Sequence, residues 1–119
     1  MPKAEYRATL AQDRNTVLIE VMIDDQPQAW SSSTAAELSS LIDLLVSLRA
    51  GMAAPFPTQP DANVAMPVVV DPCWQAGMTE RGEFALRLRH PGLGWTEYQL
   101  PAASAGPLTD VLERARGAA

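Results

Sequence analysis

The sequence has little of what small catalytic and metal sites are usually built from. Its 119 residues include a single cysteine, Cys73, and a single histidine, His90. One cysteine excludes an intramolecular disulfide and a cysteine-based zinc site, and one histidine excludes a multi-histidine metal centre. Because the acidic residues do not cluster along the chain, we also expect no site built from carboxylates alone. We therefore expect no metal and no cofactor.

Charged residues are also scarce, at 19% of the chain, and they are unbalanced: nine Lys and Arg stand against fourteen Asp and Glu, a net charge of −5. This balance disfavours nonspecific attraction to nucleic acid or to an anionic membrane surface. The hydrophobic content of 47% is ordinary and argues against a disordered chain. We expect one folded domain over residues 1–119, with roughly 65 to 70% of the unfolded surface buried.

Targeting segments and nucleotide-binding or hydrolase motifs are missing as well. Residues 1–15 do not resemble a secretory signal, and no run of about 18 apolar residues exists to span a bilayer. No Gly-x-Gly-x-x-Gly, Walker or Gly-x-Ser-x-Gly motif occurs. Eight of the nine basic residues are Arg, and alanine is abundant, which is typical of a GC-rich bacterial genome. We expect a bacterial, cytoplasmic protein.

The N-terminal part of the sequence predicts a β-hairpin. Apolar and polar residues alternate over 4–10 and again over 16–23, with polar turn residues between them. If the two apolar sets share a face, Leu10 lies opposite Val17 and Tyr6 lies opposite Val21. The same register places Arg7 opposite Glu20, a favourable cross-strand charge pair.

A helix and a proline-rich segment follow a turn at 24–27. Thr34 and Glu37 have the spacing of a capping box, and Gly51 is placed to end the helix in the left-handed conformation. The apolar stripe of this helix consists of Leu38, Leu41, Ile42, Leu45 and Leu48. Residues 52–67 contain four prolines and cannot form regular helix or interior strand, so they form a covering loop or a semi-rigid linker, with Phe56 as an anchor.

The second half predicts three strands, over 67–71, 84–89 and 95–100. Facing the apolar residues of the last two strands toward a core places Phe84 opposite Leu100 and Leu88 opposite Thr96. This register requires a loop of odd length with a left-handed glycine, Gly92 or Gly94. On the other face, Arg87 lies opposite Glu97, as an ion pair, and Arg89 lies opposite Trp95, as a cation–π contact.

A last helix begins at Ser104 or Gly106, with Pro107 in its first turn, and ends at Gly117. The predicted order is ββα, loop, βββα. Two helices with one apolar stripe each are what one antiparallel sheet needs to cover one face. We therefore predict an α+β two-layer sandwich with a mainly antiparallel sheet of about five strands.

Two residue sets suggest an enzyme. A pairing of the 67–71 strand that continues to Trp74 opposite Phe84 places Cys73 opposite Ala85, about 17 Å from His90, which argues against a thiol–imidazole pair. The same pairing aligns Asp71, Arg87 and Glu97 across three strands. This row is either a catalytic carboxylate pair clamped by the arginine or solvated scaffolding.

The remaining pattern suggests a binding surface. Leu18, Met22, Val69 and Trp95 point away from the helix-covered face in the predicted registers, so either the 52–67 loop or another protein covers them. The predicted interaction surface consists of Leu18, Met22, Val69, Arg87, Arg89, Trp95 and Glu97. A nucleic-acid platform is disfavoured by the net negative charge. The sequence favours a non-enzymatic protein–protein interaction module, either an adaptor, a chaperone-like protein or a homodimer. The alternative is a small enzyme built on Asp71, Arg87 and Glu97 or on Cys73.

Overall fold

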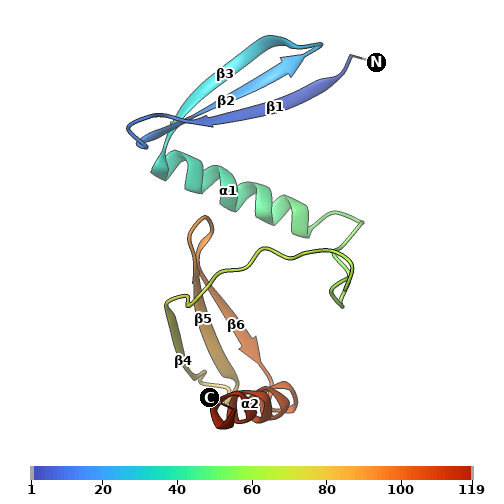
Figure 1. The fold of residues 1–119 in the computed structure, drawn as a ribbon, viewed down its shortest axis with the longest axis vertical. Coiled ribbons are helices and arrows are strands. Elements are labelled where there is room, and N and C mark those ends of the chain that lie inside the picture. Colours follow the sequence, from blue (N-terminus) through green and yellow to red (C-terminus); the bar gives the residue numbers. More distant parts are fainter. Residues whose placement is uncertain (1, 119) are drawn as a thin grey trace. The chain divides into compact units, whose positions relative to one another are not determined.

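The computed structural model describes residues 2–118, which divide into two units with their sequence boundary between Gln59 and Pro60. Each unit consists of three antiparallel strands followed by one helix (Figure 1). The α+β class is therefore confirmed. The single sheet of about five strands is wrong, because the strands form two separate sheets of three.

The first unit begins with the predicted hairpin. β1 (Ala4–Leu10) pairs with β2 (Thr16–Ile23), and Leu10 lies opposite Val17 as the alternation requires. Arg7 is the register partner of Glu20, as predicted, but its guanidinium makes its ion pair with Asp25, at 3.8 Å.

A third strand, β3 (Gln26–Thr34), pairs with the other side of β2, and the sequence did not predict it. The two-residue loop Asp24–Asp25 joins β2 to β3, with φ angles of 50° and 64°. Positive φ at both positions is the geometry of the two-residue hairpin turns that match the twist of the strands. Pro27 lies in the edge strand β3, the position in a sheet at which proline is tolerated.

α1 (Ala35–Ala50) begins at the predicted capping box. The Thr34 hydroxyl accepts from the Glu37 N–H, and the Glu37 carboxylate accepts from the Thr34 N–H. The predicted left-handed end at Gly51 is wrong, because Gly51 has φ −87° and its N–H continues helical bonding to Ser47 and Leu48.

The second unit contains β4 (Trp74–Met78), β5 (Phe84–His90) and β6 (Gly94–Leu100). The β5–β6 register is confirmed, and Gly94, with φ +80°, supplies the left-handed residue after the loop. The predicted strand at 67–71 is wrong. Asp71 has φ +49° and precedes Pro72, which together interrupt extended pairing, so the strand begins at Trp74.

α2 (Ala102–Gly117) starts earlier than predicted, directly after Pro101. Pro107 therefore lies inside the helix and not in its first turn. The segment from Gly51 to Cys73 contains no helix or strand, which confirms that residues 52–67 lack regular structure.

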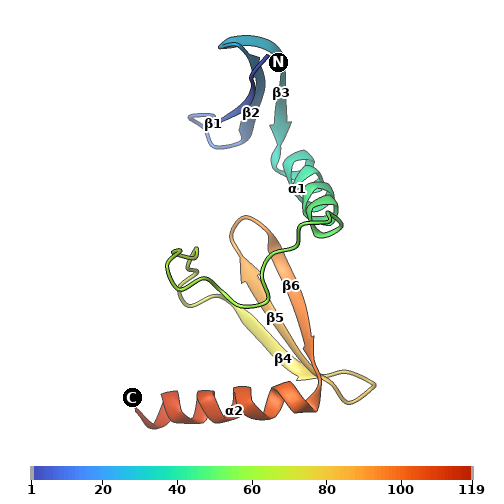
Figure 2. The same cartoon turned by 90° about the vertical axis from the view of Figure 1, so that its right-hand side faces the viewer.

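Neither helix covers the sheet of its own unit, so the predicted two-layer arrangement does not form within a unit (Figure 2). Within residues 2–118, Met22 is the one apolar side chain classed as buried, at 4% exposure. No helix in that range is long and apolar enough to cross a membrane.

Candidate functional site

The candidate site is one face of the β4–β6 sheet, here called the open face. Strand alternation and the register bring nine uncharged side chains to it. They are Trp74, Ala76, Met78, Phe84, Leu86, Leu88, Thr96, Tyr98 and Leu100. His90 at the end of β5 also lies on this face, so the ionisable groups of the face are the His90 imidazole and the Tyr98 hydroxyl, and most of its side chains are apolar.

Within the second unit, the side chains of the open face are exposed and therefore accessible to a partner. Trp74 is 65% exposed, Met78 is 69% exposed and Tyr98 is 53% exposed. Leu88 and Tyr98 also line a hollow of about 240 Å³, together with Val69. Contiguous exposed apolar surface of this kind marks interaction sites more often than ordinary monomer surface.

The sequence predicted that this face would lie under a helix layer, and the structure corrects that expectation. α2 leaves β6 after the single residue Pro101, and Val111 and Leu112 on the helix are 51% and 58% exposed. The apolar strip of α2 therefore does not shield Trp74 or Met78. The strand pattern identified the apolar face correctly, but it carried no information on where the helix would pack.

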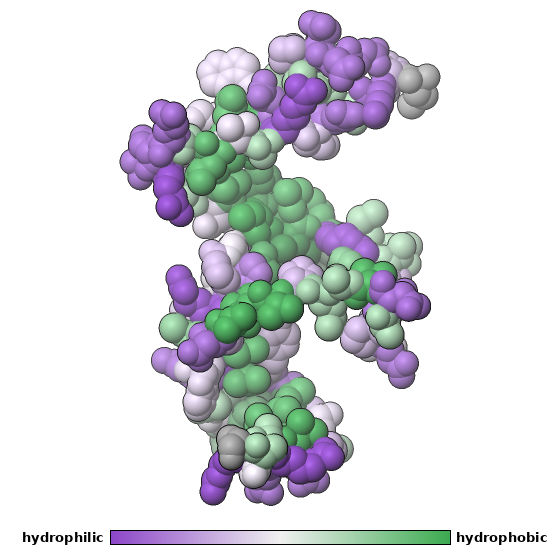
Figure 3. All heavy atoms as spheres, viewed as in Figure 1, coloured by the Kyte–Doolittle hydropathy of each residue, from purple (hydrophilic) through white to green (hydrophobic). Residues whose placement is uncertain are grey.

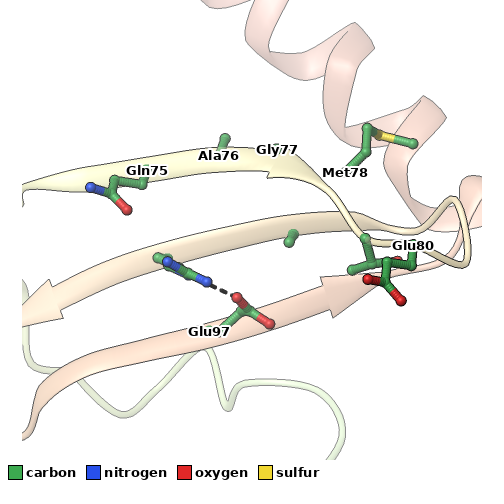
Figure 4. A pocket seen from close by; sticks show the side chains of 9 residues that line it. Gln75, Ala76, Gly77, Met78, Glu80 and Glu97 are labelled. Carbon is green, nitrogen blue, oxygen red and sulfur yellow. Dashed lines mark hydrogen bonds and ion pairs between the residues drawn. The ribbon is translucent and has the colours of Figure 1, made fainter.

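The opposite face of the sheet is polar and centres on Arg87. The Arg87 Nε donates to the Glu97 Oε1 at 2.7 Å, as the predicted ion pair requires (Figure 4). Gln99 donates to the other carboxylate oxygen, also at 2.7 Å. Arg87 and Glu97 line a hollow of about 430 Å³.

The hydrogen bond from Gln99 and then that from Arg87 lower the pKa of Glu97. The carboxylate therefore stays ionised at neutral pH with both oxygens already accepting, which makes it a weak proton donor or acceptor. The structure places Gln75, not Asp71, opposite Arg87. The predicted row of Asp71, Arg87 and Glu97 is thus not formed, because Asp71 lies in the irregular segment before β4.

Cys73 lies at a different register from the predicted one. The Arg89 N–H donates to the Cys73 carbonyl at 3.0 Å, so Cys73 lies across from Arg89 and not from Ala85. The argument that separated Cys73 from His90 by about 17 Å is therefore wrong. However, the His90 Nδ1 accepts from the N–H groups of Gly92 and Leu93, at 2.9 and 3.1 Å, so that nitrogen is not free to take a thiol proton.

The predicted interaction surface is divided between the two units. Leu18 and Met22 lie on β2, where Met22 is buried. Arg87, Arg89, Trp95 and Glu97 share the polar face of β5 and β6, where Trp95 is 52% exposed. Val69, at 36% exposure, lines the hollow beside the open face instead. The described cation–π contact is Arg49 over Phe56, at 4.2 Å, and not Arg89 with Trp95.

The proline-rich segment does not bury its own apolar side chains. Phe56 is 74% exposed despite its contact with Arg49, and Val64 and Met66 are 62% and 64% exposed. The expected anchor at Phe56 thus packs against the end of α1 in the first unit.

Within residues 2–118, no group of three or more His, Cys, Asp or Glu side chains is placed to hold a metal ion. The chain matches no protein-family model, and no curated protein or solved structure is significantly similar to it.

Proposed function

We propose that this chain is a non-enzymatic module that acts by binding protein, and that the open face of the β4–β6 sheet is its docking surface. The observation that carries the proposal is the exposure of Trp74, Met78 and Tyr98 on the two edge strands of one face that holds no Asp, Glu, Lys or Arg. Removing a large apolar side chain from water is favourable by about 1.5 to 3 kcal/mol before the costs of association.

The chemistry of the face fits a protein partner. Tryptophan and tyrosine are enriched among the residues that dominate interface energies, and aromatic residues and methionine are enriched in interface cores. Leu86 and Leu88 of the central strand, half-buried between these side chains, extend the apolar surface. The polar face around Arg87 supports the enzyme alternative less well, because the Glu97 carboxylate is committed to Arg87 and Gln99.

Two tryptophans give a matched test. Trp74 lies on the open face and Trp95 on the polar face of the same sheet, with similar exposures of 65% and 52%. Tagged wild type, Trp74→Ser and Trp95→Ser are crosslinked in native cells, and captured proteins are quantified by mass spectrometry. Circular dichroism confirms that both variants fold.

The proposal expects a protein other than this chain that is recovered with wild type and Trp95→Ser and is lost with Trp74→Ser. Loss with Trp95→Ser alone would overturn the assignment of the face and favour the polar face of Arg87, Arg89, Trp95 and Glu97, which is one part of the surface predicted from sequence. Recovery of no specific protein with wild type would overturn the proposed function.

A further inference from the structure

The connection between β3 and α1 contains no loop. β3 ends at Thr34 and α1 begins at Ala35, so Thr34 is at once the last strand residue and the helix N-cap. The capping box with Glu37 fixes this junction. Strand-to-helix connections that return a helix over its sheet commonly use about 2 to 6 residues. α1 therefore runs away from β1–β3, as both ribbon views show (Figures 1 and 2).

α1 is left with a wide apolar surface. Leu44, Leu45, Val46 and Leu48 are 52 to 59% exposed, and hydrophobic colour covers this helix (Figure 3). At about 100° per residue, its apolar side chains span roughly 200° of the helix circumference, interrupted by Glu37 in the first turn and Arg49 in the last, against the ≳100° stripe that is typical of a helix lying on one core. A helix of this kind needs a covering layer.

The sheet of the same unit also has an apolar face that no helix covers. One face of β1–β3 presents Tyr6, Ala8, Leu10, Val17, Ile19, Val21, Ile23, Ala29, Ser31 and Ser33. Tyr6 is 80% exposed and Leu10 is 56% exposed. The 16 residues of α1 span about 24 Å, and the seven to nine residues of the strands span roughly 23 to 30 Å, so the helix and the sheet face agree in length.

The amount of exposed surface is also that of an incomplete assembly. The accessible surface is 10,410 Å², whereas two independent folded domains of half this mass would expose only about 7,600 Å² together. Both units contribute to this excess of about 2,800 Å², and half of it, roughly 1,400 Å² from each chain, is in the range of about 1,000 to 2,500 Å² per partner that obligate homodimers bury.

We propose that two copies of this chain exchange α1, so that the helix of each copy covers the apolar face of β1–β3 in the other. Short connections that cannot reverse favour such exchange, and a two-fold pair satisfies both helices and both sheets at once. The charges permit it, because Glu5, Arg7 and Glu20 lie on the other face of the sheet. Two chains of net charge −5 can therefore meet here without like charges in contact. The inference goes beyond the proposed function, since it leaves the open face of β4–β6 free.

The first test is the mass of the full chain in solution by sedimentation equilibrium. We expect twice 12.8 kDa at micromolar concentration. Leu45→Glu, in the apolar stripe, is expected to weaken the dimer at least tenfold, whereas Ser47→Glu, on the opposite side of α1, is expected to leave it unchanged. Inserting five Gly and Ser residues between Ser33 and Thr34 gives α1 room to fold back and is expected to produce a monomer.

The second test places α1 directly. Leu45→Cys and Ile19→Cys chains, both also carrying Cys73→Ser, are mixed, unfolded, refolded together and treated with a bismaleimide crosslinker. Exchange predicts a crosslinked pair containing one chain of each kind. A wild-type monomer, an insertion variant that stays dimeric, or efficient crosslinking within a single chain that carries both cysteines would overturn the inference. A monomer that still captures a protein through Trp74 would overturn it and leave the proposed function standing.

Discussion

Replacing Gly94 by alanine tests the turn that sets the β5–β6 register. Gly94 has φ +80°, and a Cβ built on it would meet no atom within 4 Å. The cost of Gly94→Ala is therefore conformational and not steric, about 1 to 2 kcal/mol for an L-residue held in the left-handed region. Asparagine tolerates this region, so Gly94→Asn is expected to recover part of the loss.

Gly92, two residues earlier, is the matched control. Its φ is not positive, and an added Cβ would meet the His90 ring at 3.5 Å, an ordinary contact. Gly92→Ala restricts the unfolded chain without straining the folded one and is expected to be neutral or to stabilise by about 0.4 to 1 kcal/mol.

The assay is thermal and urea unfolding, followed by circular dichroism at one protein concentration, because self-association makes the midpoint depend on concentration. For a unit of about 60 residues, 1 kcal/mol corresponds to a shift of roughly 4 to 8 °C in Tm. We expect Gly94→Ala to melt below wild type and Gly92→Ala to melt at or above it. Equal stability of the two alanine variants would refute the assignment of the left-handed position to Gly94.

Three further outcomes are expected. Thr34→Ala removes the hydroxyl of the α1 capping box and is expected to cost about 1 kcal/mol by urea unfolding. The bond from the Thr34 N–H, the larger cause of the lowered pKa of Glu37, remains, so that pKa should rise only in part in an NMR titration. Gln99→Ala is expected to raise the pKa of Glu97. Because folding lowers that pKa, the ionised Glu97 carboxylate stabilises the folded chain near neutral pH, and this stabilisation is lost as the pH falls through the acidic range. Pro107→Ala restores a helical N–H in α2 and should raise stability by up to about 3 kcal/mol, with a gain of helical circular dichroism.

The sequence correctly predicted those strands and helix ends whose own residues show apolar alternation or a capping box. The alternation over β1, β2, β5 and β6 fixed both hairpin registers, because a slip of one residue would turn Val17 or Leu88 to the opposite face. The Thr34 and Glu37 spacing located the start of α1 to the residue.

The missed strand β3 shows where pattern fails. Its residues, Gln-Pro-Gln-Ala-Trp-Ser-Ser-Ser-Thr, show no apolar alternation, since an edge strand beside β2 has less to bury. The one usable signal was the Asp24–Asp25 pair, a residue type that tolerates the positive φ of a two-residue hairpin.

The candidate site required knowledge that local pattern does not contain. Facing Phe84, Leu86 and Tyr98 to one side was correct, but assigning a helix to that side assumed that each helix returns over its own sheet. The lengths of the junctions at Thr34 and Pro101 oppose that assumption. The site at Asp71 failed for a different reason, because one left-handed residue next to Pro72 moved the start of β4.

The edge formed by β4 has a consequence for the handling of this protein. Sheet edges are usually protected by charge or proline against pairing with other chains. The other edge strands carry Arg7 in β1, Pro27 in β3 and Glu97 in β6, whereas Trp74–Met78 carries neither charge nor proline. β4 is thus the edge at which the chain is most prone to aggregate by strand addition. A partner bound to the open face beside β4 would also hinder such pairing.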